Sequence, residues 1–517
     1  MSSSLQSNVS HGDEIRSPKL GFGGWMRWIW SQITSMRTAL LLLLLLAVAA
    51  IPGSILPQRS ADPNGVTTYF QNNPQSAPIL DKFQLFDVYT SSWFSSIYLL
   101  LFISLVGCVI PRIRHHWDAL VSEPIDIPRS LARFPAKKTV SSRKADALEL
   151  VGSTLKRKRF RVKLTPTGIS AEKGYLRETG NLLFHVSLLG VLVSVAVGGA
   201  TSFSGQRVLV EGDTFVNNLA GYDSFSPGAW FKSESLVPFS VKLDRFQAIF
   251  DLKNTTNVGT PLDFRAYVSV KNSANAVSKN SLIRVNYPLE VPGANIYLTG
   301  NGYAPVLTFK DADGNVSFSG PVIYMPQDNN YTSLGVIKNA DAKPAQYGVL
   351  SFFYPTAAKL TTGALTSSYP APVNPLVSMN VYVGNLGLDS GIPSNAFQLA
   401  VHGLKQVAGG KSGTKALVLD TIGQTIALPN GLGTVTWDGL KRYASLDIDY
   451  NPAQGWVFGF ALAAFLGLAA SLLIPRRRVF VKKTETGLEL AAMAKNDDPK
   501  LDSILESLTE SLKVKKK

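Results

Sequence analysis

Four long runs of apolar residues separate polar segments of very different length along the chain. A helix that crosses a bilayer needs about 20 predominantly apolar residues, and each run has that length. The pattern therefore predicts four membrane-spanning helices, at residues 38–57, 93–111, 181–200 and 456–475.

The first span has an alternative interpretation. Its seven leucines, Leu40 to Leu46, are followed by Ala47-Val48-Ala49, and small residues at this spacing are typical of a signal-peptide cleavage site. Against cleavage, residues 1–37 are long and include Trp25, Trp28 and Trp30 close to Arg27. Tryptophan rings favour the headgroup region, so we expect an uncleaved span that follows a cytoplasmic or interfacial N-terminal segment.

Lysine and arginine predict the orientation, because loops rich in these residues stay in the cytoplasm. Residues 112–180 hold 16 basic and 7 acidic residues, and Arg476-Arg477-Arg478 follows the last span. In contrast, the loop at 58–92 has only Arg59 and Lys82 as basic residues. We therefore expect both termini and residues 112–180 in the cytoplasm, and residues 58–92 and 201–455 outside it.

The polar segments differ in their expected structure. Residues 112–180 show one helical stretch and two strand-like stretches, which predict a small cytoplasmic α+β module. Residues 201–455 alternate apolar and polar positions between clusters of Gly, Asn, Asp and Pro, as all-β domains do. Residues 476–517 are expected to form a cytoplasmic tail. The predicted fold is an integral membrane protein with four transmembrane α-helices, a large all-β extracytoplasmic domain and this α+β module.

Composition narrows the class of protein. The net charge of +15 is explained by the sidedness of the loops, and the basic run KRKRFRVK at residues 156–163 alternates with apolar residues like a half-buried strand. Both observations argue against nucleic acid as a partner. Cys108 is the only cysteine, so the chain has no CxxC pair and cannot act as a dithiol oxidoreductase by itself.

Histidine is the most informative residue type. Only five are present, and the sequence has no catalytic triad, nucleotide-binding loop or zinc-ligand spacing. Four of the histidines have ordinary expected roles. His11 lies in a polar tail, His115 and His116 are expected at a solvated or headgroup position, and His402 is expected in a strand or turn. Cys108 is expected to pack against neighbouring residues.

His185 differs because it lies about one turn inside the third span. An ionisable residue at that depth suggests function, and the neutral imidazole favoured there is the form that binds iron. Arg177, Asn181 and His185 share one helical face, so a flat anionic cofactor could place its metal on His185 and its carboxylates near Arg177. In the alternative interpretation, His185 hydrogen-bonds a neighbouring helix or leans toward the headgroups.

Taken in order, these features resemble the ResB family, also called CcsB. Its third span shares the spacing Gly-x-x-x-x-His, here Gly180 to His185. Four stretches carry the resemblance: WSQITSMRTALLLLLLLAVAAIPGSILPQ at 30–58, WFSSIYLLLFISLVGCVIPR at 93–112, GYLRETGNLLFHVSLLGVLVSVAVGG at 174–199, and the approach to the fourth span with its basic exit at 427–481.

The resemblance implies a role in System II cytochrome c assembly. ResB-like proteins pair with a ResC or CcsA membrane subunit, move haem across the membrane and join it to the CxxCH of apocytochrome c. A thioredoxin-like reductant is a further expected partner. By position, His185 corresponds to the family's transmembrane histidine, an axial ligand of transiently bound haem b. This chain lacks the tryptophan-rich loop of the partner, so we expect a subunit of a haem lyase that is not catalytic alone.

Two other classes stay open from the residues themselves. One is a membrane-anchored extracytoplasmic binding or scaffold protein without a cofactor. The other is a transporter for a small solute, although four spans are few and the paired broken helices of such folds are not evident.

Overall fold

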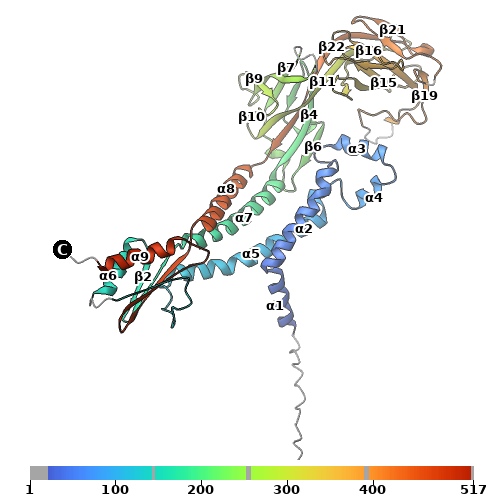
Figure 1. Cartoon of the computed structure of the whole chain (residues 1–517). Helices are drawn as coiled ribbons and strands as arrows, with labels where there is room; N and C mark the ends of the chain where they lie inside the picture. Colours follow the sequence, from blue (N-terminus) through green and yellow to red (C-terminus); the bar gives the residue numbers. More distant parts are fainter. Residues whose placement is uncertain (1–20, 142–145, 252–257, 389–394, 411, 514–517) are drawn as a thin grey trace, which may run out of the picture. The chain divides into compact units, whose positions relative to one another are not determined.

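The computed structural model describes residues 21–513 except 142–145, 252–257, 389–394 and 411 (Figure 1). The chain divides into two compact units. We call Met1–Val197 with Ala453–Lys517 the membrane unit, and Gly198–Pro452 the β-rich unit.

Four helices of the described chain are long and apolar enough to cross a bilayer. This finding confirms that each of the four apolar runs forms a helix of the length and hydropathy needed to span a membrane. The second of them, α5, continues ten residues past Pro111 into the polar sequence. The four are α2 (Met36–Ile55), α5 (Ser92–Val121), α7 (Leu176–Thr201) and α8 (Gln454–Leu473).

Glycines allow α7 and α8 to pack closely. A Cβ atom built on Gly180 of α7 would lie 2.7 Å from the carbonyl oxygen of Gly467 on α8. One built on Gly190 would lie 2.4 Å from the ring of Phe460. Small residues at such contacts let two helices approach within a membrane, where packing rather than the hydrophobic effect holds them together.

A short helix, α1 (Phe22–Ile33), precedes the first span and buries none of its residues. Trp25, Trp28 and Trp30 are all exposed on it. This is the arrangement expected of an amphipathic segment at a membrane surface.

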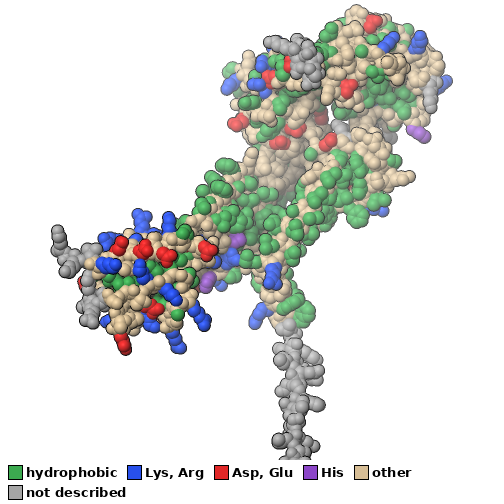
Figure 2. Space-filling model, in the orientation of Figure 1, with side chains coloured by type: hydrophobic (Ala, Val, Ile, Leu, Met, Phe, Trp, Pro, Cys, Tyr) green, Lys and Arg blue, Asp and Glu red, His purple; other side chains and the backbone are tan. Residues whose placement is uncertain are grey.

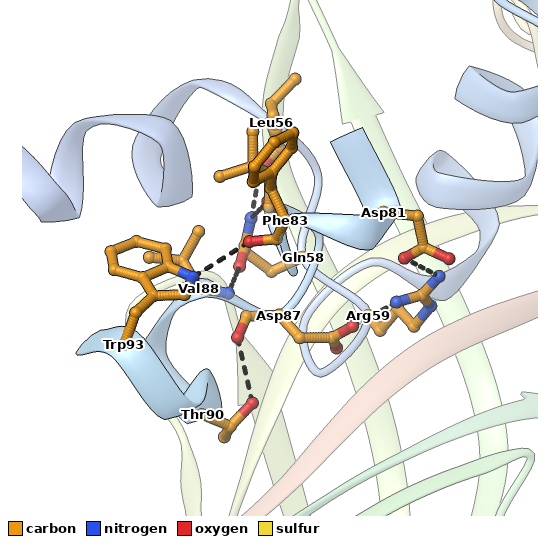
Figure 3. Close-up of polar contacts among 10 residues, drawn as sticks. Leu56, Gln58, Arg59, Asp81, Phe83, Asp87, Val88, Thr90 and Trp93 are labelled. Carbon is orange, nitrogen blue, oxygen red and sulfur yellow. Dashed lines mark hydrogen bonds and ion pairs between the residues drawn. The ribbon is translucent and has the colours of Figure 1, made fainter. Parts of the chain in front are cut away.

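The loop between α2 and α5 folds around a small polar network (Figure 3). Arg59 forms ion pairs with Asp81 and Asp87, and the Gln58 side chain donates to two backbone carbonyls and accepts from the backbone N–H of Val88. At the start of α5, Trp93 Nε1 donates to the carbonyl of Phe83 at 3.0 Å. The loop contains α3 (Pro63–Asn72), α4 (Ala77–Lys82) and the 3₁₀ turn η1 (Val88–Thr90).

The membrane unit also contains a five-stranded antiparallel sheet in the order β1-β24-β23-β3-β2. Its two strands β23 and β24 come from residues 476–517, which the sequence analysis describes only as a tail. Helices α6 (Ala147–Arg157) and α9 (Lys500–Lys513) bury their apolar faces with this sheet. The strands are β1 (Ala136–Val140), β2 (Arg161–Thr165), β3 (Gly168–Lys173), β23 (Arg477–Thr484) and β24 (Gly487–Ala494).

The β-rich unit is built on two long strands, β11 (Ala294–Lys310) and β22 (Thr434–Tyr450), which pair antiparallel along their whole length. Described residues of this unit form strands, loops and 3₁₀ turns, apart from the end of α7, as the alternating pattern predicts. The seven-stranded sheet also holds β4 (Phe203–Val210), β6 (Ser224–Pro227), β10 (Leu289–Val291), β12 (Val316–Pro321) and β21 (Thr425–Ala427).

Three further sheets complete this unit. One has four strands: β5 (Thr214–Val216), β7 (Ser240–Phe250), β8 (Pro261–Lys271) and β9 (Lys279–Arg284). One has six: β13 (Met325–Pro326), β14 (Ser333–Asn339), β15 (Tyr347–Tyr354), β18 (Leu376–Val383), β19 (Lys405–Ala408) and β20 (Leu417–Leu419). The last is the hairpin β16 (Ala357–Lys359) and β17 (Leu365–Ser367).

Each half of the long strand pair contributes to a different hydrophobic core. Ile296 and Leu446 belong to the core that includes the four-stranded sheet, whereas Phe309 and Trp437 belong to the core that includes the six-stranded sheet. The two ends of the strand pair therefore pack against different sheets of this unit.

Candidate functional site

Within the helices, His185 of α7 lies against Arg112 of α5. The Nε2 atom of His185 is 3.0 Å from Nη1 of Arg112, and both side chains are half-buried. A guanidinium has donors only, so Arg112 donates and Nε2 accepts through its lone pair. The proton of this neutral imidazole is therefore on Nδ1.

Arg112 links three helices at this point. Its Nη2 group contacts the sulfur of Met36 at the start of α2, while Nη1 reaches His185 on α7. None of the ion pairs among the described residues gives Arg112 a carboxylate partner. A thioether is a weak acceptor, so the cation is held by a lone pair and a sulfur atom without a counter-charge.

A second imidazole belongs to His116, which lies one helical turn after Arg112 on α5. Its Nε2 is 3.1 Å from the hydroxyl of Thr179 on α7, and that hydroxyl donates to the carbonyl of Tyr175 at 3.2 Å. His116 Nε2 is therefore the donor to Thr179. Its Nδ1 atom is buried and has no hydrogen-bond partner among the described residues. From the sequence we expected a solvated or headgroup position for His116. The spacing of Arg112 and His116 at i, i+4, which puts them on one helical face, was the available signal for this site.

Cys108 completes this face of α5. Its thiol donates to the carbonyl of Thr34, with Sγ 2.8 Å from the oxygen, at the junction of α1 and α2. Its contact is with protein backbone, in agreement with the expected packing role.

No hydrogen bond among the described residues joins the remaining candidates to His185. Arg177 contacts the side chain of Asn496, with Nη2 3.3 Å from Oδ1, so the cation beside His185 is Arg112. His115 is exposed on α5, and His402 is exposed in a turn of the β-rich unit. His11 lies outside the described residues. The described part of the chain has no group of three His, Cys, Asp or Glu side chains that could hold a metal ion, so His185 would supply a single protein ligand.

A buried ion cluster fixes the chain just before α7 and just after α8. Glu172 of β3 pairs with Arg476 at 2.5 Å and with Arg478 at 2.9 Å, and it accepts from the hydroxyl of Tyr175 at 2.8 Å. Burial alone would raise the pKa of Glu172, but the Tyr175 hydrogen bond and the two arginine charges outweigh it and hold the pKa below its ordinary value.

The cluster therefore anchors the start of the helix that carries His185. Arg476 also pairs with Glu178 in the first turn of α7, at 3.1 Å, and its guanidinium lies 3.7 Å from the centre of the Tyr175 ring. Sequence reasoning did not find this cluster, because its members come from residues about 300 positions apart.

These features define a class: an integral membrane protein with four spanning helices, a sheet-rich unit of about 255 residues, and an imidazole–guanidinium pair between two of the helices. The chain belongs to the ResB-like family, whose sequence model matches residues 36–506. The resemblance drawn from the sequence is thereby confirmed.

Curated relatives are named cytochrome c biogenesis protein CcsB. The chain is 25% identical over 293 residues to that of Thermosynechococcus vestitus, covering 54% of this chain and 61% of the relative. It is 25% identical to that of Microcystis aeruginosa over 293 residues, covering 54% and 62%, and 27% identical to that of Crocosphaera subtropica over 305 residues, covering 57% and 63%. The matched part of the chain thus spans about three fifths of the length of these relatives.

Proposed function

We propose that this chain is a cytochrome c biogenesis subunit which, with a ResC/CcsA-type membrane partner, transfers haem across the membrane and presents it for thioether attachment to the CxxCH of apocytochrome c. Membership of the ResB-like family and the names of the relatives support the process. The observation that carries the proposal for this chain is the imidazole lone pair of His185, which lies between α5 and α7 beside Arg112. No ion pair in the described part of the chain includes that arginine.

The residues present fit haem as the transported group. Haem has three features that such a site must match. Its iron binds neutral imidazole, its ring is apolar, and its two propionates are anionic. His185 supplies the neutral imidazole, Arg112 supplies the cation, and Phe184, whose ring centre is 5.2 Å from that of His185, supplies an apolar neighbour. His185 would supply one axial ligand and the partner the other, so the chain should not complete the reaction alone.

The proposed orientation places haem binding in the inner half of the membrane. Figure 2 shows basic side chains, with acidic ones among them, over the sheet of the membrane unit and apolar side chains along the helices. Residues 112–180 hold 16 basic and 7 acidic residues, and basic residues favour the cytoplasmic side. His185 is nine residues into α7, or roughly 13 Å along the helix axis at 1.5 Å per residue. On this proposal both termini are cytoplasmic, and the β-rich unit is extracytoplasmic, where it would hold apocytochrome c.

The single cysteine gives the chain no dithiol with which to reduce the CxxCH of its substrate. A thioredoxin-like protein is the proposed source of reducing equivalents. The contribution of this chain would be to hold haem so that its vinyl groups lie close to the two thiols, which is a proximity effect.

The test is His185→Ala in the complex co-expressed and purified with its partner. We expect loss of haem absorbance and of c-type cytochrome yield, with partial recovery when imidazole is added to replace the missing ligand. His402→Ala, at an exposed turn, is the matched control and should behave as the unmodified protein. Unchanged haem content and yield in His185→Ala would contradict the proposal and favour a scaffold role without a cofactor.

A further inference from the structure

The contact between Arg112 and His185 involves the same lone pair that would bind iron. Nε2 of His185 accepts from Arg112 at 3.0 Å, and an atom with one lone pair cannot accept this hydrogen bond and bind a metal at the same time. Binding of iron to Nε2 therefore requires Arg112 to leave.

The described contacts of Arg112 do not neutralise its charge, so its guanidinium can pair with an anionic ligand. Its contacts are the imidazole of His185 and the sulfur of Met36, both uncharged, and no described ion pair includes it. Arg112 directly follows the apolar run of α5, and its half-buried side chain contacts His185 on α7 rather than extending into the cytoplasm. A guanidinium and a carboxylate form two parallel hydrogen bonds, which is the strongest pairing open to arginine.

We propose that Arg112 caps the Nε2 lone pair of His185 until haem arrives, and then moves to a haem propionate while Nε2 binds the iron. The cap keeps an imidazole ligand neutral and unreactive, and the incoming group supplies both the metal that replaces the hydrogen bond and the carboxylate that receives the guanidinium. In this step the hydrogen bond from Arg112 to Nε2 would break, and the freed lone pair would be available to an open axial position of the iron, with no electron or proton transferred. Arg112 is thus a positioning residue that favours an anionic porphyrin over an uncharged one.

The second half of this proposal rests on the proposed function, whereas the first half does not. The cap can be tested without haem by acylation with diethyl pyrocarbonate. In this reaction the free lone pair of a neutral imidazole attacks a carbonyl carbon of the reagent, and ethyl carbonate leaves. The full chain in detergent is treated, and modification of each histidine is followed by peptide mass spectrometry. We expect Arg112→Gln to increase the acylation rate of His185 about tenfold, because it removes a charged donor.

Two controls test whether a higher acylation rate is specific to loss of the Arg112 contact. Arg114→Gln removes the same charge from an exposed position of the same helix and should leave the rate at His185 unchanged. His116 reports on loosening of the helices, since its Nε2 donates to Thr179 of α7 and its Nδ1 is buried. An unchanged rate at His185 in Arg112→Gln, or an equal rise at His116, would overturn the cap.

The exchange is tested by comparing haem with haem dimethyl ester, whose propionates carry no charge. The unmodified chain should bind haem about tenfold more tightly than the ester, as followed by the absorbance of the imidazole complex. Arg112→Gln should remove this preference by weakening haem alone, and Arg112→Lys should restore part of it. An undiminished preference in Arg112→Gln would overturn the propionate contact. If His185→Ala binds both porphyrins as well as the unmodified chain, the proposed function fails instead, and the acylation result still decides the cap.

Discussion

Glu172 and Arg476 form a buried ion pair that joins the strand before α7 to the segment after α8, with Arg476 Nη2 2.5 Å from Glu172 Oε2. The two residues are 2% and 8% exposed, so each charge depends on the other for the interactions that water would otherwise provide. The pair therefore couples the two helices to the sheet of the membrane unit.

Removal of this carboxylate should destabilise the membrane unit. We expect Glu172→Gln to cost about 3 kcal/mol, because two arginines lose the partner that compensates their burial. The measurement is the free energy of unfolding of the purified chain in detergent. Glu178→Gln is the matched control: Glu178 pairs with the same Arg476, but its side chain is 45% exposed, so its loss should cost no more than about 1 kcal/mol. Equal effects of the two substitutions would contradict the role of burial.

The same carboxylate predicts a dependence of stability on pH. The folded state lowers the pKa of Glu172 below its ordinary value of 4.5, so folding favours the ionised form. Its contribution is fully present above pH 4.5 and is lost as the pH falls through the lower folded pKa. The difference in melting temperature between the unmodified chain and Glu172→Gln should be constant above pH 5 and should narrow below pH 4.5. A difference that widens toward acid pH would reverse the assigned direction.

The contact between α7 and α8 should tolerate no side chain at its centre. In Gly180→Ala the new Cβ would lie 2.7 Å from the carbonyl oxygen of Gly467 and 2.8 Å from Cβ of Ala470, so the helices must separate. We expect a loss of about 1–3 kcal/mol, as for overpacked cores, measured by unfolding in detergent. Gly199→Ala is the control on the same helix, because nothing lies within 4 Å of its added Cβ; it should leave the stability unchanged or slightly higher.

The proposed orientation can be read from two single-cysteine variants in a Cys108→Ser background. Ser273→Cys places a thiol in an exposed turn of the β-rich unit, and Thr486→Cys places one in the exposed turn between β23 and β24. A membrane-impermeant maleimide should label the first in intact cells and the second only after lysis. Labelling in the opposite order would invert the topology, and with it the side from which haem enters.

Sequence patterns predicted the elements whose cause is local. The seven leucines from Leu40 to Leu46 specify a spanning helix by length and hydropathy alone, and the alternating residues of 201–455 specify strands. Residues 477–494 were harder to interpret, since the inward-facing Val479 and Val481 are flanked by arginines and lysines that resemble a solvated tail. Their strand structure depends on pairing with β3, which is about 300 residues away in sequence.

In the candidate site, too, the features with a local cause were predictable and those that depend on distant contacts were not. The depth of His185 in an apolar run marked it as unusual without any knowledge of its neighbours. Its partner was not predictable, because Arg112 is 73 residues away and the contact depends on the register between α5 and α7. Arg177 is the cation on the same helix as His185, but in the structure it contacts Asn496 instead.

The pairing of β23 with β3 also has a consequence for biosynthesis. One edge of β3 pairs with β2, which directly precedes it in the sequence. The other edge pairs with residues 477–482, which are synthesised some 300 residues later. During that interval β3 presents an open strand edge, the kind of surface that promotes aggregation. Completion of the sheet thus requires that the whole β-rich unit and α8 have been synthesised first, so chains that stop short of β23 should be recognised as unfinished.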